Sequence, residues 1–325
     1  MNIRIVKNRS DIGGGTRGSD MGIDAIEVAA INANNPYFTR FSFVDVPSHN
    51  ETVYAKVHAQ FAKRIVFVVE QCERVFHDVK NALDDDCFPI VLSGDHSSAI
   101  GTIAAIKTKN PEKRVGVVWI DAHADLHSPY TTPSGNLHGM PLCASLGFDN
   151  IECQSNSVTE KTLGNWSKLK DLGTDAPKIL PEDIVFYGLR DTEVPENYLI
   201  NTHGMRVIKV DEFRHRGAEK CIREGMERLS NCDLIYLSFD VDSMDPDRVS
   251  KGTGTPVPRG FDPNEVRAII NGFIDTGKVA CLEICEVNPL LDTTGNQMAE
   301  HAFGVLDDVT EHWLHHNTTA VMSGL

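Results

Sequence analysis

Short apolar runs recur along the chain, and each is long enough for one buried β-strand. Most of these runs are continuously apolar and do not alternate with polar positions. That pattern is typical of parallel strands covered by helices on both faces. The predicted strands are residues 3–6, 41–46, 89–92, 115–120, 184–189, 207–210, 233–239 and 279–284.

Apolar residues spaced three or four apart predict helices between these strands. They cover residues 51–83, 99–107, 194–201, 212–229, 264–276 and 296–313. Strands and helices that alternate with right-handed crossovers form an α/β fold. We therefore expect a three-layer α/β/α sandwich around a mostly parallel sheet of about eight strands. Residues 148–181 are the least periodic and are predicted to be a surface excursion. Without a linker or repeat, residues 1–325 are expected to form a single domain.

Charge and composition narrow the class of protein. The chain has 31 Lys and Arg against 46 Asp and Glu, a formal net charge of −15, with no block of five like charges. Hydrophobic residues make up 41% and charged residues 24%, which excludes a disordered chain. The acidic balance argues against nucleic acid as a partner, because a phosphate backbone needs clustered basic residues. It is compatible with metal ions or cationic substrates.

The sequence also predicts a reduced, cytoplasmic protein without a membrane partner. The N-terminus is too polar for a signal peptide, and the longest apolar run, residues 65–69, is far shorter than a membrane span. The eight cysteines contain no CxxC pair. Residues 13–18, GGGTRG, match a dinucleotide-binding pattern, but a polar stretch separates them from the first strand, so we interpret them as a flexible loop.

Three predicted strands lead directly into side chains that can bind a metal. Residues two apart in an extended chain point the same way, and ligands of open α/β folds gather beyond the carboxyl ends of strands. We therefore expect these side chains to converge. The candidate ligands are His96, Asp121, His123, Asp125, Asp240 and Asp242.

This ligand set predicts two ions. Four carboxylates crowded together would repel one another and would be costly to bury unless cations were present. Six ligands exceed what one ion commonly takes from a protein and suit a pair that shares bridging carboxylates. An oxygen-rich set without thiolates favours manganese or magnesium over a structural zinc, and the two histidines weaken the case for magnesium.

The chain resembles the ureohydrolases (arginase, agmatinase and relatives) and looks most like arginase. The resemblance covers about residues 89–288 and is carried by SGDHS at 93–97, DAHAD at 121–125 and SFDVDSMDP at 238–246. It implies two Mn²⁺ per chain. His96 and Asp125 would bind one ion, His123 and Asp242 the other, and Asp121 and Asp240 would bridge both.

The resemblance also implies a substrate site. The loop SGNLHG at 134–139 is similar to the arginase loop for an α-carboxylate, which assigns Ser134 and Asn136 to substrate binding. Glu286 matches the glutamate that binds the guanidinium, and His138 matches a proton shuttle with an ordinary pKa near 6.5. The segment GLRDTEVPE at 188–196 resembles the one whose acids, here Glu193 and Glu196, bind the α-amino group.

Three positions depart from the arginase pattern. His127 replaces an asparagine, Glu193 replaces an aspartate, and Ser93 replaces a glycine. His127 and Glu193 both fall in the part of the site that would recognise an amino acid. Hydrolysis of a small cationic guanidino substrate is therefore better supported than arginine itself.

The expected reaction is attack on the guanidinium carbon by a hydroxide that bridges the two ions, with Asp125 orienting it and passing its proton toward the leaving amine. The products would be urea and an amine, ornithine if the substrate is L-arginine. The alternatives are another guanidino or formimino substrate (guanidinobutyrate, formiminoglutamate, guanidine or agmatine), or a non-catalytic metal-binding member. Arginase resemblance further implies a homo-oligomer, a trimer or a hexamer.

Four other residues receive ordinary interpretations. His301 is expected to be a packing or surface residue, and Cys281 and Cys285 are expected to be core thiols rather than a redox pair. Glu283, three residues before Glu286, is expected to lie behind the site and order it.

Overall fold

The structure is a computed structural model that describes residues 2–175 and 177–323. Eight parallel strands form one sheet in the order β2-β1-β3-β8-β7-β4-β5-β6. The strands are β1 (Asn2–Asn8), β2 (Ser42–Asp45), β3 (Cys87–Ser93), β4 (Val115–Ile120), β5 (Ile184–Tyr187), β6 (Arg206–Ile208), β7 (Leu234–Asp240) and β8 (Val279–Cys285). The predicted parallel sheet of eight strands is confirmed.

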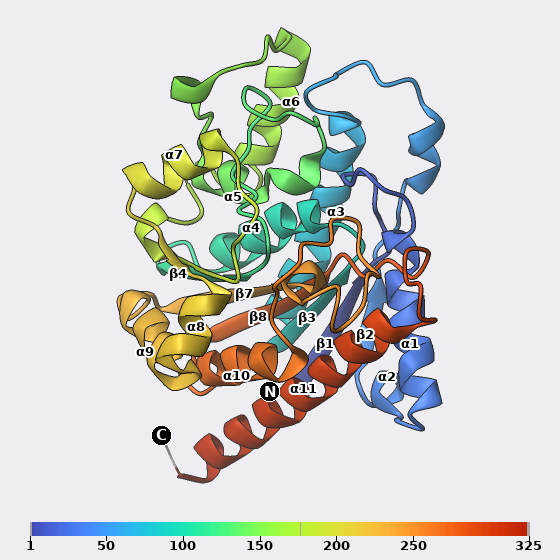
Figure 1. Cartoon of the computed structure of the whole chain (residues 1–325), viewed down its shortest axis with the longest axis vertical. Helices are drawn as coiled ribbons and strands as arrows, with labels where there is room; N and C mark the ends of the chain where they lie inside the picture. The colour runs from blue at the N-terminus through green and yellow to red at the C-terminus, as the bar shows by residue number, and fades with distance from the viewer. Residues whose placement is uncertain (1, 176, 324–325) are drawn as a thin grey trace.

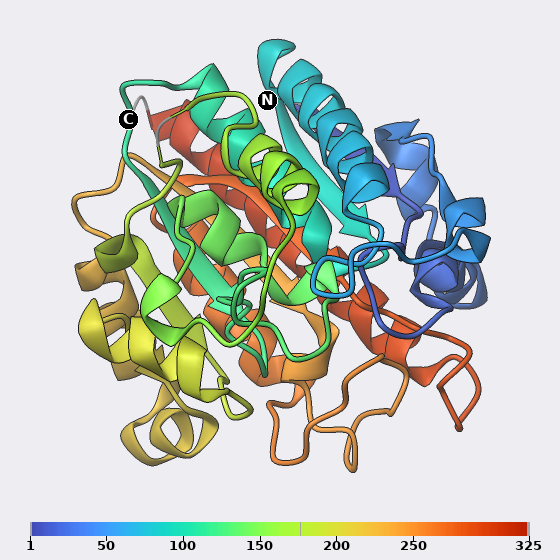
Figure 2. The ribbon, with the colours of Figure 1, turned by 90° about the horizontal axis from the view of Figure 1, so that it is seen from above.

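Helices cover both faces of the sheet. They are α1 (Gly22–Asn32), α2 (Tyr37–Arg40), α3 (Ile65–Asp84), α4 (Ala99–Lys109), α5 (Pro141–Leu146), α6 (Glu160–Lys170), α7 (Val194–Thr202), α8 (Val210–Arg216), α9 (Ala218–Arg228), α10 (Pro263–Ile274) and α11 (Gln297–Ser323). In Figure 1, α3 to α7 lie on one side of the sheet, and α10 and α11 lie on the other. Figure 2 shows helices α3 to α7 from above, with the red helix α11 behind the sheet. The three-layer sandwich is confirmed.

Each face of the sheet has its own apolar core. Val117 and Trp119 of β4 pack into the core beneath α3 to α6, whereas Val118 and Ile120 pack into the core beneath α8 to α11. Neighbouring residues of a strand point to opposite faces, so a strand buried on both faces must be apolar at every position. This explains why the central strands appear in the sequence as continuous apolar runs.

Two predicted helices differ from the structure. The helix predicted over residues 51–83 begins only at Ile65, after Arg64 with φ of 58°. The one predicted over 212–229 is two helices, α8 and α9, separated by Gly217 with φ of 88°. A positive φ is incompatible with a continuing right-handed helix, and hydrophobic spacing alone does not reveal it.

The region predicted to be a surface excursion contains α6. Its buried positions are Thr162, Asn165, Trp166 and Leu169, which have helical spacing. Only two of the four are apolar, so a search for apolar periodicity does not find this helix. The predicted surface excursion over 148–181 therefore contains a helix at residues 160–170 that the sequence pattern did not indicate.

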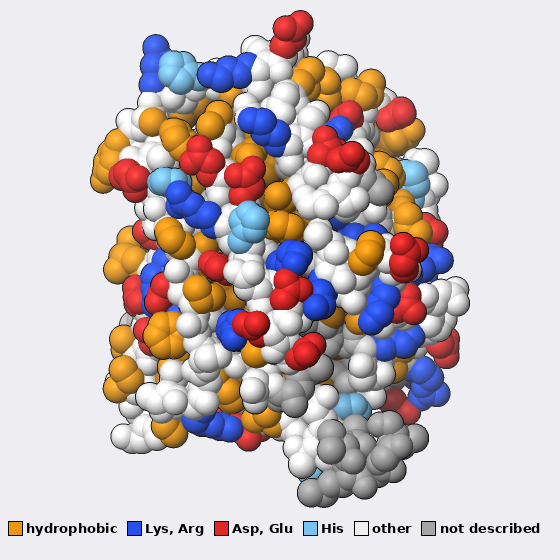
Figure 3. Space-filling view, turned by 180° about the vertical axis from the view of Figure 1, so that it is seen from behind, with side chains coloured by type: hydrophobic (Ala, Val, Ile, Leu, Met, Phe, Trp, Pro, Cys, Tyr) orange, Lys and Arg blue, Asp and Glu red, His pale blue; other side chains and the backbone are white. Residues whose placement is uncertain are grey.

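Charged side chains of both signs lie on the surface of the molecule (Figure 3). On the face seen in Figure 3, basic and acidic side chains are interspersed and do not gather in one basic area. None of the helices in the described part of the chain has both the length and the apolar character needed to cross a bilayer. The eight cysteines, all within the described residues, are free thiols.

Candidate active site and metal centre

The predicted ligands lie at the carboxyl ends of the central strands β3, β7 and β4. Strands β7 and β4 are neighbours, and β8 lies between β3 and β7. His96 follows β3, the DAHAD segment follows β4, and Asp240 and Asp242 lie at the end of β7. Parallel strands end at the same edge of a sheet, so segments more than 100 residues apart meet there. The structure brings all six predicted ligands into this region.

One group of side chains surrounds His96. Its Nδ1 atom lies 3.1 Å from Asp121 Oδ2, 3.3 Å from Asp125 Oδ2 and 3.2 Å from Asp240 Oδ2. His96, Asp121 and Asp125 form one set of three donor atoms that are close enough to share an ion. We call His96, Asp121, Asp125 and Asp240 the first group.

A second group surrounds His123, whose Nδ1 lies 2.9 Å from Asp242 Oδ2 and 3.5 Å from Asp121 Oδ1. Asp121 belongs to both groups, which is the arrangement expected of a bridging carboxylate. Asp240 was also expected to bridge. Its Oδ2 faces His96, and its Oδ1 accepts the backbone N–H of Asp242 at 2.8 Å, as Asp121 Oδ1 accepts that of His123 at 2.7 Å. The bridging role of Asp240 stays a prediction.

The donor set fits a pair of divalent cations. His96 Nδ1 and Asp121 Oδ2 are buried and have no hydrogen-bond partner among the described residues. Burial and repulsion by Asp242 and Asp121 raise the pKa of Asp240 well above its ordinary value. Burial and the charge of Asp121 raise the pKa of Asp125 to about 7. Such groups are unfavourable alone and are stabilised by a cation.

A network behind the first group holds the His96 ring. The ring stacks on Trp119, with centroids 4.0 Å apart, and its Nε2 lies 2.6 Å from Ser238 Oγ. When Nε2 carries the proton it donates to Ser238 Oγ, and Nδ1 then presents its lone pair to the carboxylates, as a metal ligand must. The orientation of the ring is therefore set by its neighbours.

Glu283 lies behind the site, as expected, and is buried. Its carboxylate accepts hydrogen bonds from Ser93 Oγ at 2.8 Å, Ser98 Oγ at 2.6 Å and Tyr236 OH at 2.8 Å. Ser93, one of the departures from the arginase pattern, therefore has a structural role as a donor to Glu283. Ser98 belongs to the turn that carries His96, so Glu283 ties this turn to β8.

Two residues of the site have strained backbones. Asp125 has φ of 51° and Glu286 has φ of 66°, in the left-handed region that favours glycine. The Glu286 N–H donates to Gly94 O at 2.9 Å, and Asp125 O accepts from the Leu142 N–H at 3.2 Å. Strain of this kind persists where the surroundings hold it in place, and it is concentrated at functional sites.

All of the predicted site residues line one cavity of about 220 Å³. They are His96, Asp121, His123, Asp125, His127, Ser134, Asn136, His138, Glu193, Glu196, Asp240, Asp242 and Glu286. A cavity of this size suits a small molecule. The chemistry of its wall is dominated by carboxylates, which suits a cationic one.

His138 and Glu286 form a close pair in this cavity, with Nδ1 and Oε1 3.0 Å apart. Burial alone would lower the pKa of His138, but the hydrogen bond and charge of Glu286 outweigh it and raise the pKa to about 9. This differs from the ordinary value of about 6.5 expected from the sequence. Glu286 Oε1 also accepts the His96 N–H at 3.1 Å, so its carboxylate is held firmly.

The far end of the cavity contains His127 between two glutamates. Its Nε2 lies 3.4 Å from Glu193 Oε2 and 3.6 Å from Glu196 Oε2, and burial lowers its pKa. Both oxygens of Glu196 already accept backbone N–H groups, those of Leu126 and Glu193. Glu193 is half-exposed, so of the two it is the carboxylate that a ligand can reach.

The SGN loop is held against the segment before α3. Gly135 has φ of 77°, and a Cβ atom there would lie only 1.9 Å from Gln60 O. Its carbonyl accepts the Lys63 N–H at 2.7 Å. Only glycine fits this position, which orients Ser134 and Asn136 toward the cavity.

The glycine-rich segment 13–18, predicted to be a flexible loop, is a loop that hydrogen bonds hold beside the site. The Gly13 N–H donates to Asp95 Oδ2 at 2.9 Å, and Gly13 O accepts the His138 N–H at 3.1 Å. Its backbone therefore helps to support the turn that carries His138, and it has defined partners on both sides.

Three residues at the site were not predicted from the sequence to belong to it. Asp191 Oδ2 lies 3.7 Å from His123 Nε2, and Thr255 Oγ1 donates to Asp242 Oδ2 at 3.0 Å. Cys285 Sγ lies 3.6 Å from Asp240 Oδ2. Asp191 is part of the GLRDTEVPE segment and could have been found there, whereas no local signal marks Thr255 or Cys285. His301 is half-buried on α11 and does not line the cavity, in agreement with its ordinary interpretation.

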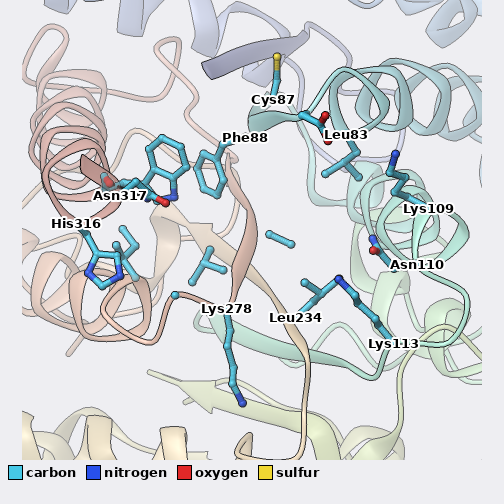
Figure 4. A pocket seen from close by; sticks show the side chains of 16 residues that line it. Leu83, Cys87, Phe88, Lys109, Asn110, Lys113, Leu234, Lys278, His316 and Asn317 are labelled. Carbon is cyan, nitrogen blue, oxygen red and sulfur yellow. Dashed lines mark hydrogen bonds between the residues drawn. The ribbon is translucent and has the colours of Figure 1, made fainter. Parts of the chain in front are cut away.

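A second cavity, of about 290 Å³, lies at the opposite end of the strands. Figure 4 shows Lys109 and Lys113 on one of its walls and His316 and Asn317 on the other. Phe88 stacks on Trp313 in its lining, with ring centroids 4.4 Å apart. None of the predicted site residues lines it, so the candidate chemistry lies at the carboxyl edge of the sheet.

Known proteins resemble this chain over most of its length. The family model described as "Arginase family" matches residues 2–310. The chain is 35% identical to an arginase from Bacillus subtilis over 292 residues, covering 89% of this chain and 91% of the relative. It is 34% identical to an arginase from Brevibacillus brevis, covering 95% and 97%.

Solved structures give the same result for the fold. The native structure of arginase from Bacillus caldovelox superimposes with a TM-score of 0.81 at 30% sequence identity, covering 95% of this chain and 97% of that one. Fold, sequence and the converging ligand groups therefore lead to one conclusion: the chain belongs to the arginase family of ureohydrolases and is a hydrolase.

Proposed function

We propose that the protein hydrolyses a guanidino group to release urea, with L-arginine as the substrate and L-ornithine as the second product. The observation that carries this proposal is the meeting, in one carboxylate-lined cavity, of Glu286 with the two metal-capable groups that share Asp121. A guanidinium stays charged at physiological pH, so an acidic cavity attracts it. Curated relatives that cover most of this chain are named arginases.

The proposal includes two divalent ions, with manganese as the expected metal. His96, Asp121, Asp125 and Asp240 would hold one, and Asp121, His123 and Asp242 the other. Bound divalent ions supply Lewis acidity and make water a competent nucleophile near neutral pH. The buried, unpartnered His96 Nδ1 and Asp121 Oδ2 support this assignment.

The protein's own residues bind the substrate and move protons. Glu286, fixed by its bonds to the His96 N–H and to His138, presents a carboxylate of defined orientation to a planar guanidinium. Asp125 is positioned to take a proton from the attacking water and to deliver it to the leaving nitrogen. His138, with its side chain 19% exposed, exchanges the remaining proton with solvent.

A second candidate substrate is a guanidino acid without an α-amino group, such as guanidinobutyrate. His127 favours it, because a histidine flanked by Glu193 and Glu196 differs from the neutral amide expected for recognition of an α-amino acid. The formimino substrates and agmatine belong in the same comparison.

The deciding experiment is a substrate panel with manganese-reconstituted protein, measuring urea or formamide release. We expect release from L-arginine that depends on added metal and is lost in Asp240→Ala. Activity only with another guanidino compound would change the substrate. An active, metal-replete Asp240→Ala protein, or no activity with any member of the panel, would contradict the proposal. We further propose that the protein is cytoplasmic and that it forms a homo-oligomer, a trimer or a hexamer. Gel filtration with light scattering measures the number of subunits.

A further inference from the structure

A thiol lies against the first metal-capable group. Cys285 is the last residue of β8 and is 1% exposed. Its Sγ lies 3.6 Å from Asp240 Oδ2, the same oxygen that is 3.2 Å from His96 Nδ1. The sulfur, the nitrogen and the oxygen all lie within 4.8 Å of one another.

These spacings match the edges of a coordination polyhedron. Bond lengths of about 2.3 Å to sulfur and about 2.0 Å to nitrogen or oxygen give tetrahedral edges of about 3.5 Å between sulfur and oxygen and about 3.3 Å between nitrogen and oxygen. The observed separations, 3.6 Å and 3.2 Å, agree with both. Two of the three separations are therefore compatible with ligands around one ion, and the third, between sulfur and nitrogen, is within 4.8 Å.

A second observation, which also supports the proposed metal centre, favours a cation at this point. His96 Nδ1 is buried and has no hydrogen-bond partner in the described part of the chain, although its ring is held by Trp119 and Ser238. A nitrogen lone pair that is fixed and unsatisfied beside a thiol and a carboxylate is arranged to receive a cation.

We propose that Cys285 Sγ is a direct ligand of the ion held by His96 and Asp240, which gives this site nitrogen, oxygen and sulfur donors. Such a set selects a thiophilic divalent ion, Zn²⁺, Co²⁺ or Fe²⁺, over Mn²⁺. The second group, Asp121, His123 and Asp242, has no sulfur and keeps the preference for Mn²⁺. Binding replaces the thiol proton, which passes to water. The inference rests on the proposed function, since it concerns one of the two ions of that centre.

The test uses Co²⁺ as the probe on the full chain, stripped of metal and kept reduced. Cobalt reports its binding through visible d–d bands and reports a sulfur ligand through a near-ultraviolet thiolate-to-cobalt charge-transfer band. We expect both signals in the wild-type protein. In Cys285→Ala and Cys285→Ser we expect the visible bands to persist and the charge-transfer band to disappear.

Cys281→Ala is the matched control, because Cys281 is a buried thiol on the same strand and is absent from the metal-capable groups of the described residues. It should retain both signals. Removing a partner of a metal ligand costs about 10–100-fold in affinity, so removing a direct ligand should weaken Zn²⁺ and Co²⁺ binding by about 100-fold or more. The affinity for Mn²⁺ should change less, within about 10-fold.

The outcomes separate this inference from the proposed function. Cobalt that binds without a charge-transfer band, or with a band that survives in Cys285→Ala, overturns the role of Cys285 and leaves the ureohydrolase centre intact. Failure of the wild-type protein to bind cobalt or manganese at all overturns both. The persisting visible bands in Cys285→Ser establish that the variant is folded.

Discussion

His138 Nδ1 and Glu286 Oε1 lie 3.0 Å apart inside the cavity, and this contact makes the stability of the metal-free protein depend on pH. The pair raises the pKa of His138 to about 9, above its ordinary value of about 6.5. A raised histidine pKa contributes stability that is complete below about pH 6.5 and is lost as the pH rises through about 9.

We therefore expect the free energy of unfolding to fall by up to about 3 kcal/mol between pH 6.5 and 9.5 because of this pair. Urea denaturation of the metal-free protein across this range measures it. In His138→Asn the fall in the free energy of unfolding over this pH range should be smaller by that amount. Parallel curves for the two proteins would show that the pair contributes nothing.

Asp125 should destabilise the metal-free protein and stabilise the loaded one. Its pKa of about 7 is raised above the ordinary carboxyl value, so the unfolding free energy falls as the pH rises from about 4 to 7. At pH 8, Asp125→Asn should stabilise the metal-free protein by about 1–3 kcal/mol. With manganese present it should lower the melting temperature, since a ligand is lost. A variant that is less stable in both states would contradict this.

Removing ligands one at a time should remove ions selectively. Asp121 belongs to both groups, whereas Asp242 belongs only to the second, where it contacts His123. We expect Asp121→Asn to lose both ions and Asp242→Asn to retain one, measured by elemental analysis after gel filtration. Asp84→Asn, which changes a surface aspartate paired with Lys80, is the control and should retain both. Equal losses in the two site variants would show that the ions bind as one unit.

His127 should determine which guanidino compound is preferred. A hydrogen bond to a charged group is worth about 1.5–3 kcal/mol, so His127→Asn should raise the kcat/KM ratio of L-arginine to guanidinobutyrate by about 10–100-fold. His301→Asn, outside the cavity, should leave the ratio unchanged. A ratio unaffected by His127→Asn would remove this residue from substrate recognition.

Glu283 should be important for stability although it touches no substrate. Three buried hydroxyl groups donate to its carboxylate. Glu283→Gln replaces one acceptor oxygen with a donor and leaves a hydroxyl unpaired, so we expect a loss of about 2–4 kcal/mol by chemical denaturation. Glu219→Gln, at a highly exposed position, should change stability by less than about 0.5 kcal/mol.

Local sequence patterns predicted which side chains form the site, but not how each one is bonded. SGDHS, DAHAD and SFDVD are short segments whose spacing after apolar strands indicated the side chains that gather at one sheet edge. The capping box of Glu193 and Glu196 is also local, but its consequence is not. Only the structure reveals that Glu196 is already occupied by backbone donors and that Glu193 remains accessible.

Hydrophobic periodicity by itself determined the eight parallel strands and most of the helices, because burial on both faces requires an apolar residue at every strand position. It could not determine where Gly217 and Arg64 interrupt a helix, since those breaks depend on backbone conformation. Nor could it find α6, whose buried stripe is half polar.

Tertiary structure alone decided which groups meet. The pairing of His138 with Glu286, the shared position of Asp121, and the place of Cys285 beside Asp240 join residues from distant segments of the chain. Their pKa values and metal-binding capacity depend on through-space distances and burial, which the order of residues along the chain does not contain. The sequence therefore determined the chemical groups of this hydrolase, and the fold decided how each one is paired.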